Sequence, residues 1–358
     1  MLFFGKPKSY LGIDIGHAGV KVVELKKEKG RPVLFTYGYS LKPWHRETKS
    51  DSVPTAQEQD GLAQMISSVC RQARVTTRTA VVSIPASHIF HALVTLPIAQ
   101  KDDLNRMLES EVKKLLPYPL TDAQLDYQVV TKDEAAKTQR VLVSAVPKAI
   151  VSAYAGAAKA AGITLDALEP ESVALSRSLI GRDTATALLV DIGDTRTNFF
   201  IVDNTYPITQ QSIEIGAERL TAVVGQTLGI DVAVSETVKK NIFDFILSRP
   251  EIKEMTKQSF LNMAMPVIEP IVKEIEYSME LYTRQSTTKN KIVEKIIFTG
   301  GGSFFPYLTD YVSELFKIKT YVGDPWGRVV FPDGLQPVLR ALAPRMAVAI
   351  GLALRNVV

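Results

Sequence analysis

The chain is poor in the residues that build disulfides, metal centres and membrane spans. It has 1 cysteine, Cys70, which excludes an intramolecular disulfide and suits a reducing compartment. Cys70 lies in a helical pattern of apolar residues, which predicts a core position rather than a nucleophile. The 4 histidines fall at a hairpin tip or in loop and strand patterns, and none is well placed for catalysis. No uninterrupted apolar run reaches about 18 residues, so the sequence predicts no transmembrane helix.

Charge of one sign is not in excess either. The chain has 42 Lys and Arg against 38 Asp and Glu, a net charge of +4, and its basic residues are not interleaved with aromatic ones. A nucleic acid partner is therefore not expected. The 46% hydrophobic share is ordinary for a globular protein, and 358 residues predict two or more domains. Met1–Lys8 is too short for a signal peptide, and a frayed or locally packed terminus is expected there.

Two stretches share one layout, in which an apolar strand, an Asp-x-Gly turn and a returning strand follow each other. They are Leu11–Leu25 and Leu188–Val202. A single Asp-x-Gly is a weak signal, because both residues are common in turns. Two copies, one in each half of the chain and each between strands, indicate a repeated structural unit with a shared task.

Phosphate binding is the chemistry that this layout suits. Gly16 and Gly193 allow backbone N–H groups to approach a phosphate closely. Asp14 and Asp191 would be repelled by phosphate directly, so we expect them to hold a hydrated Mg²⁺ beside it. The polar residues at the two tips add hydroxyl donors and positive charge, although a histidine there is equally typical of an exposed turn. The predicted phosphate-binding residues are Asp14, Gly16, His17, Lys21, Asp191, Gly193, Thr195 and Thr197.

A third glycine-rich element, Gly300-Gly301-Gly302, lies between the predicted strand Lys295–Phe298 and the predicted helix Tyr307–Phe316. Three glycines let the backbone pass close to a flat ligand such as adenine or ribose. The element is neither the G-x-G-x-x-G of a dinucleotide fold nor a P-loop. It therefore favours a nucleotide site of another kind.

The segment from residue 87 to 162 reads as an insert with its own core. Its pattern is strand, helix, strand, strand, helix, which is enough for a small α+β subdomain. The helix Lys101–Leu116 is predicted to stop at Pro117-Tyr118-Pro119. Its apolar side, which is expected to face the core of the insert, carries Leu104, Met107, Leu108, Val112 and Leu115. We predict a first lobe of residues 1–86, 163–186 and 340–358, the insert 87–162, and a second lobe 187–339.

These elements together resemble the actin, sugar-kinase and heat-shock-protein superfamily. The resemblance implies an α/β, actin-like (ribonuclease H-like) two-lobe fold that clamps ATP and Mg²⁺ and carries an inserted α+β subdomain. It also implies a water- or metal-positioning role for Glu169, at the start of the predicted helix Glu169–Ile180, where several relatives have Asp. The residues implied to face the nucleoside are Glu236, Lys239, Gly300, Gly301, Gly302 and Ser303.

Within that superfamily, almost the whole chain resembles the PilM family of type IV pilus assembly proteins. The most distinctive stretches are Lys113–Tyr127, with its Leu-Leu-Pro-Tyr-Pro, and the closing Leu342–Arg355. The resemblance implies a partner, the cytoplasmic N-terminal peptide of the inner-membrane protein PilN, in a groove between the first lobe and the insert. Candidates for that groove, which subdomain core packing and a helix stop explain equally well, are Leu96, Pro97, Leu116, Pro117 and Tyr118.

Three functions remain open at this point. We favour a pilus scaffold in which ATP acts as a conformational ligand that alters the peptide groove, with slow hydrolysis or none. An FtsA-like filament-forming membrane tether is the first alternative. Its closing amphipathic membrane helix is not expected here, because the chain ends directly after the last predicted helix. A small-molecule kinase is the weaker alternative, since no phosphoacceptor pocket is readable.

The expected location is cytoplasmic, at the inner membrane only through the partner. The sequence leaves open whether other inner-membrane pilus proteins or a second copy of the chain also bind.

Overall fold

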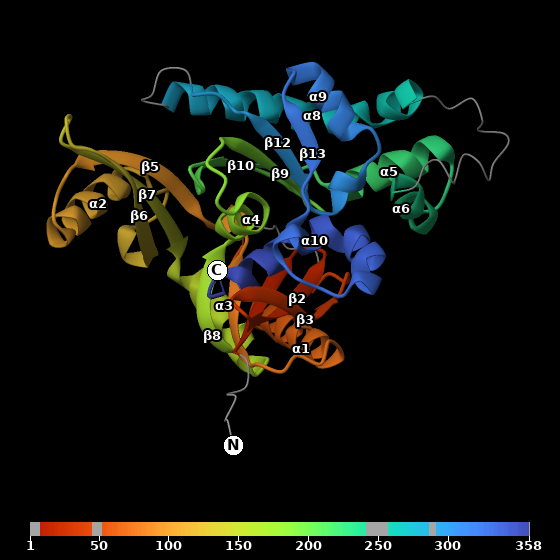
Figure 1. Cartoon of the computed structure of the whole chain (residues 1–358), viewed down its shortest axis with the longest axis horizontal. Helices are drawn as coiled ribbons and strands as arrows, with labels where there is room; N and C mark the ends of the chain where they lie inside the picture. Colours follow the sequence, from red (N-terminus) through yellow and green to blue (C-terminus); the bar gives the residue numbers. More distant parts are fainter. Residues whose placement is uncertain (1–7, 45–51, 241–256, 286–290, 358) are drawn as a thin grey trace. The chain divides into compact units, whose positions relative to one another are not determined.

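The computed structural model describes residues 8–44, 52–240, 257–285 and 291–357, apart from the side chains of 237–240, 257 and 260. The chain divides into two compact units (Figure 1). Unit 1 comprises Met1–Arg177, Tyr206–Gln210 and Val348–Val358. Unit 2 comprises Ser178–Thr205 and Gln211–Ala347.

A five-stranded sheet of order β3-β2-β1-β4-β8 forms the centre of unit 1. β1 pairs antiparallel with β2 and parallel with β4, and β4 pairs parallel with β8. β1 and β2 follow the alternating apolar pattern of the first predicted hairpin. The strands are β1 (Ser9–Gly16), β2 (Gly19–Glu28), β3 (Arg31–Tyr39), β4 (Thr79–Ile84) and β8 (Thr164–Pro170).

Two helices, α1 (Ala56–Gln72) and α3 (Lys148–Ala160), pack their apolar faces into one core with β1, β2 and β4. Thr55 caps α1 in a capping box with Glu58, which satisfies backbone donors at the helix start. Cys70 is 1% exposed in this core, and burial raises the pKa of its thiol to about 11. The predicted core position is confirmed, and the protonated thiol is no nucleophile.

The insert forms a three-stranded sheet of order β5-β7-β6 with its own apolar core. Its strands are β5 (Phe90–Pro97), β6 (Ala123–Asp133) and β7 (Thr138–Pro147), and α2 (Lys101–Leu115) lies beside them (Figure 1). Leu104, Leu108 and Val112 of α2 are buried as predicted. Leu115 is not, since 49% of it is exposed at the last turn of the helix.

The predicted helix Glu169–Ile180 begins two residues later than expected. β8 extends to Pro170, because Glu169 and Pro170 pair with Ser83 and Ile84 of β4. A residue before proline favours extended backbone, which supports this extension. The chain then forms α4 (Glu171–Leu175) and a π-helical turn, Ser176–Ile180. Glu169 is therefore a strand-end residue and not the first residue of a helix.

A second five-stranded sheet, of order β11-β10-β9-β12-β13, repeats the strand pattern of the first. β9 pairs antiparallel with β10 and parallel with β12, and β12 pairs parallel with β13, as β1, β2, β4 and β8 do in unit 1. The strands are β9 (Ala187–Ile192), β10 (Thr197–Asp203), β11 (Tyr206–Ile213), β12 (Lys295–Thr299) and β13 (Lys319–Val322).

Among the described residues after the second hairpin, the helices are α5 (Ala217–Leu228), α6 (Val232–Lys240), α8 (Lys257–Gln285), α9 (Leu308–Phe316) and α10 (Gln336–Leu354). The sequence Ser235–Leu247 predicts a helix with Ser235 as a plausible N-cap. The structure has a helix there as far as Lys240, beginning at Val232, and the rest of the predicted range lies outside the described residues.

α10 is strongly apolar. With the turn before it, the 22 residues Asp333–Leu354 are long and apolar enough to cross a membrane, and 67% of their apolar 18-residue stretch is buried inside the protein. Arg340 and Arg345 lie within this helix, so it contains no uninterrupted apolar run of the length that the sequence prediction required. Close packing explains the composition, since a Cβ on Gly12 would lie 2.2 Å from the Ala349 carbonyl oxygen.

Candidate functional site

The first hairpin holds a nearly buried carboxylate. Asp14 is 3% exposed and stands opposite Lys21 in the β1–β2 register. The Lys21 Nζ lies 2.8 Å from Asp14 Oδ2, and Ser83 Oγ donates to Oδ1 at 3.3 Å. Ser83 Oγ in turn accepts from the Ile15 N–H at 2.8 Å. Three elements, β1, β2 and β4, therefore fix this carboxylate and its cation at the end of the sheet.

The tip of this hairpin is shaped around the lysine. A Cβ on Gly16 would lie 3.1 Å from Lys21 Nζ, so the glycine leaves space for the ammonium group. The Gly16 carbonyl accepts from Trp44 Nε1 at 3.2 Å. His17 follows, half-buried at the turn itself. The structure thus brings together all four residues predicted for the first phosphate motif.

The second hairpin is held by the start of α5. The Gly193 carbonyl accepts from the Ala217 N–H and the Asp194 carbonyl from the Glu218 N–H, each at 2.9 Å. Asp191, Gly193 and Thr195 lie half-buried at this tip.

Thr197 is placed differently from the other predicted residues of the second motif. Its side chain is fully buried, and its hydroxyl donates to the Ile215 carbonyl at 2.6 Å. This hydroxyl ties β10 to the chain leading into α5. Its contribution is to the shape of the hairpin, whereas Thr195 remains at the tip.

The glycine turn lies directly on the end of β9. Gly300 has a φ of +80°, and a Cβ on it would lie 2.5 Å from Asp191 Oδ1. A Cβ on Gly302 would lie 2.2 Å from Ile192 Cγ2, so only glycine fits at both positions. Ser303 Oγ donates to the Gly300 carbonyl at 2.7 Å and closes the turn. The third motif is thereby joined to the carboxylate of the second.

Glu236, one of the residues predicted to face the nucleoside, has two partners that the sequence did not reveal. Glu236 accepts from Thr221 Oγ1 at 2.9 Å and from Arg345 Nη2 at 3.3 Å. Arg345 also packs against Gly301, since a Cβ there would lie 3.4 Å from its Nε. Thr221 and Arg345 carry no local motif, and only the fold brings them to Glu236. Lys239 lies in α6, but its side chain is outside the described residues.

Glu169 is engaged in an ion pair. Arg177 Nη1 and Nη2 donate to its two carboxylate oxygens at 2.8 and 2.7 Å, and Arg355 Nε lies 4.0 Å away. Arg177 Nη1 also donates to the Gly351 carbonyl at 2.7 Å, so the pair joins β8 to α10. The geometry gives Glu169 a structural task, and its role toward water or metal stays a prediction.

The residues predicted for the partner groove divide into two sets. Leu96 is 6% exposed in the core of the insert, and Leu116 packs against that core. Pro97 and Pro117 are exposed. Tyr118 is half-buried, its hydroxyl lies 3.4 Å from the Ala145 carbonyl, and burial raises the pKa of its phenol. With the exposed Leu115, Pro117 and Tyr118 form an apolar segment at the end of α2.

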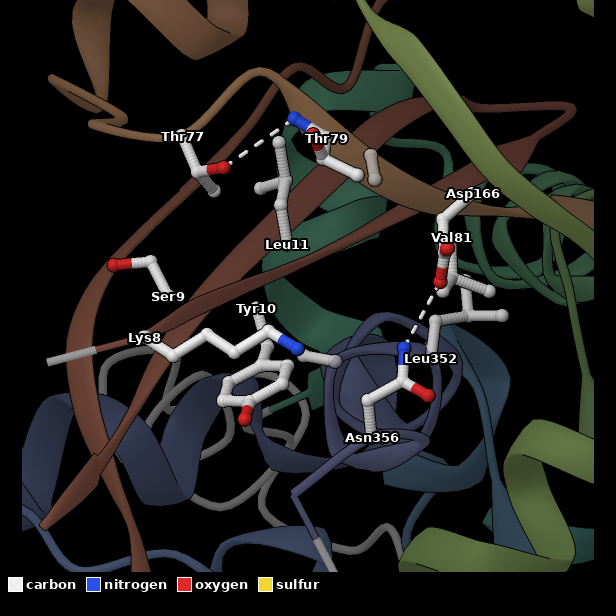
Figure 2. A pocket seen from close by; sticks show the side chains of 12 residues that line it. Lys8, Ser9, Tyr10, Leu11, Thr77, Thr79, Val81, Asp166, Leu352 and Asn356 are labelled. Carbon is white, nitrogen blue, oxygen red and sulfur yellow. Dashed lines mark hydrogen bonds between the residues drawn. The ribbon is translucent and has the colours of Figure 1, made fainter.

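A cavity of about 320 Å³ lies elsewhere in unit 1, where β1 begins (Figure 2). Lys8, Tyr10, Thr77, Asp166 and Asn356 are among its lining residues. Asn356 Nδ2 donates to Asp166 Oδ2 at 2.9 Å, as Figure 2 shows. None of the predicted site residues lines it, and its polar groups make no recognisable catalytic set.

Within the described ranges, no group of three or more His, Cys, Asp or Glu side chains is arranged to hold a metal ion. Mg²⁺ does not need such a group, because it keeps several waters and is commonly bound through one or two carboxylates plus substrate phosphates. Each hairpin carries one carboxylate of that chemical type, Asp14 in the first and Asp191 in the second.

The repeated sheet, with a hairpin of the same design in each copy and a glycine turn in the second, defines an actin-like fold. Solved structures agree. EutJ from Carboxydothermus hydrogenoformans aligns over 98% of this chain and 91% of its own at 15% identity and a TM-score of 0.56. MreB5 of Spiroplasma citri bound to AMPPNP aligns over 98% and 97% at 12% identity and a TM-score of 0.50. The predicted fold class is confirmed.

The family follows from the sequence as a whole. The family model of the type IV pilus assembly protein PilM matches residues 12–357, and the chain belongs to this family. A solved PilM–PilN type IV pilus biogenesis complex aligns over 98% of both chains with 21% identity and a TM-score of 0.79. The curated cell division protein FtsA of Borreliella burgdorferi is 24% identical over 181 residues, which are 46% of this chain and 43% of FtsA.

Proposed function

We propose that the chain is an ATP-binding scaffold of the type IV pilus inner-membrane assembly complex. The observation that carries the nucleotide part is the contact between the Gly300 turn and the Asp191 carboxylate, with Arg345 linking the same turn to Glu236. The phosphate residues of the first hairpin, Asp14 and Lys21, complete the proposed set. MreB5, which has the same fold, is bound to AMPPNP in a solved structure, and this supports a nucleotide as the ligand.

Mg²⁺ is assigned to Asp14 and Asp191 through water, where it would neutralise phosphate charge. The residues of this chain would orient the nucleotide. Lys21 places a point charge at the first hairpin, and the glycines of both tips allow backbone donors to approach. Fast hydrolysis also needs a group that positions the attacking water. Glu169, the residue predicted for it, is engaged by Arg177, so we expect slow hydrolysis or none.

The proposed partner is the cytoplasmic N-terminal peptide of PilN, the protein that accompanies PilM in the solved complex. In this chain the peptide would contact the insert at Leu115, Pro117 and Tyr118. Leu115 is 49% exposed although it is apolar, and apolar exposure beside an aromatic ring suits a docking surface. The expected place of the scaffold is the cytoplasmic face of the inner membrane, reached through this partner.

Substituting Leu115 tests the partner assignment. We expect Leu115→Ser to weaken binding of a labelled PilN N-terminal peptide by roughly fivefold or more, because about 1–2 kcal/mol of apolar burial is lost. Fluorescence anisotropy measures the affinity. Val338→Ser, at a site in unit 2 that is 50% exposed, is the matched control and should leave affinity unchanged. Equal affinities of wild type and Leu115→Ser would place the peptide on another surface.

A filament-forming, FtsA-like tether is a second candidate, because the FtsA match covers part of the chain. Pelleting of the purified protein with ATP, and binding to lipid vesicles without any partner, would favour it. A scaffold that reaches the membrane through PilN should bind vesicles only when they carry PilN.

A further inference from the structure

Two consecutive residues of α10, Pro344 and Arg345, contact the glycine turn. The Pro344 carbonyl accepts from the Gly300 N–H at 3.1 Å and from Thr299 Oγ1 at 3.0 Å. At the next residue, a Cβ on Gly301 would lie 3.4, 3.7 and 3.8 Å from Nε, Nη2 and Cζ of Arg345. The Nε and Nη2 side of the guanidinium therefore lies against Gly301. The backbone and the side chain of α10 therefore both fix its position on the turn.

The same arginine holds the carboxylate of Glu236. Arg345 Nη2 contacts Oε1 at 3.3 Å, while Thr221 Oγ1 donates to Oε2 at 2.9 Å. Thr221 is itself 6% exposed, and its single hydroxyl hydrogen is shared between Glu236 Oε2 and the Ala217 carbonyl, which lies 3.0 Å from Oγ1. The Glu236 side chain is 37% exposed and that of Arg345 only 16%. Two well-buried donors thus orient a carboxylate that remains open to solvent.

We propose that Arg345 is a positioning residue that, with Thr221, aims Glu236 at the ribose hydroxyls of the bound nucleotide and so makes the site selective for ribose. This rests on the proposed nucleotide function. A carboxylate accepts strong, charge-assisted hydrogen bonds from hydroxyl groups. A site built for such bonds rejects an analogue that lacks them. A carboxylate released from Arg345 adopts several orientations and loses that selectivity.

Calorimetric titration of the full chain with Mg-ATP and with 2′,3′-dideoxy-ATP measures the selectivity as a ratio of two Kd values. For the wild type we expect ATP to bind about tenfold more tightly or better, as one or two charge-assisted hydrogen bonds provide. Arg345→Met and Thr221→Val should each reduce this ratio severalfold, because they weaken the binding of ATP and leave the binding of 2′,3′-dideoxy-ATP unchanged. Arg345→Lys should recover part of it. Arg340→Met, an exposed arginine earlier on α10, should leave it unchanged.

The ratio distinguishes a loss of positioning from a general disturbance of the fold, because a disturbed fold lowers the affinities for ATP and 2′,3′-dideoxy-ATP alike. An unchanged ratio in Arg345→Met and in Thr221→Val, with a wild type that binds ATP, would overturn the positioning role and leave the nucleotide function standing. A wild type that binds neither ligand would overturn both.

Discussion

Asp191→Ala is expected to lower the affinity for Mg-ATP by roughly 10- to 100-fold, the loss typical when a group that supports a bound metal is removed. The carboxylate lies at the end of β9, against Gly300, and belongs to the hairpin that α5 holds in place. Its removal leaves the phosphates without one of two proposed Mg²⁺ partners. Calorimetry with Mg-ATP measures the change.

Asp191→Asn is the sharper variant because it keeps the size of the side chain beside Gly300 and removes only the charge. In the presence of Mg²⁺ it should bind ATP nearly as weakly as Asp191→Ala. After Mg²⁺ is removed with EDTA, wild type and Asp191→Asn should converge. A wild type whose affinity is indifferent to Mg²⁺, with Asp191→Asn equal to it, contradicts the assignment.

Arg177→Met is expected to destabilise the protein by about 3 kcal/mol or more, since it removes both hydrogen bonds of a buried carboxylate and leaves only Arg355, whose Nε lies 4.0 Å away. Glu169 is 9% exposed at its side chain and accepts both of its short bonds from Arg177. The bond from Arg177 to the Gly351 carbonyl is lost as well. The free energy of unfolding from urea denaturation measures the effect.

Two comparisons make this stability result specific. Replacing both partners, Glu169→Gln with Arg177→Met, should recover much of the loss because no charge remains buried. Lys273→Met, which breaks the exposed pair with Glu269, should change stability by less than about 1 kcal/mol. An Arg177→Met variant as stable as Lys273→Met would show that the buried pair contributes nothing. If Glu169→Gln alone also lowers the affinity for Mg-ATP, Glu169 has a role in nucleotide binding besides its structural one.

Much of the fold could be read from local signals. The two hairpins appear where alternating apolar residues flank Asp14-Ile15-Gly16 and Asp191-Ile192-Gly193, because strand period and turn chemistry act over a few residues. The glycine turn was equally visible, and its need for glycine is explained by a contact with Asp191. Cys70 was correctly assigned to the core from its helical spacing.

Features that depend on partners distant in sequence could not be read. Arg345 and Glu236 are 109 residues apart, and no local pattern links them. Glu169 was expected at a helix start, but pairing with Ser83 extends the strand through it. Leu115 has the spacing of a core residue, yet it lies at the last turn of α2 and stays exposed. In each case tertiary contacts, or their absence, decide against the local pattern.

The most direct measurement is the affinity for the PilN N-terminal peptide, titrated into the purified chain with and without Mg-ATP. Coupling between two ligand sites usually changes an affinity by about 5- to 150-fold. We expect a change in that range for the wild type, and none in Asp191→Ala, which retains the peptide site. Peptide binding that is the same with and without Mg-ATP would contradict a nucleotide-tuned scaffold, and no peptide binding in either condition would contradict the scaffold itself.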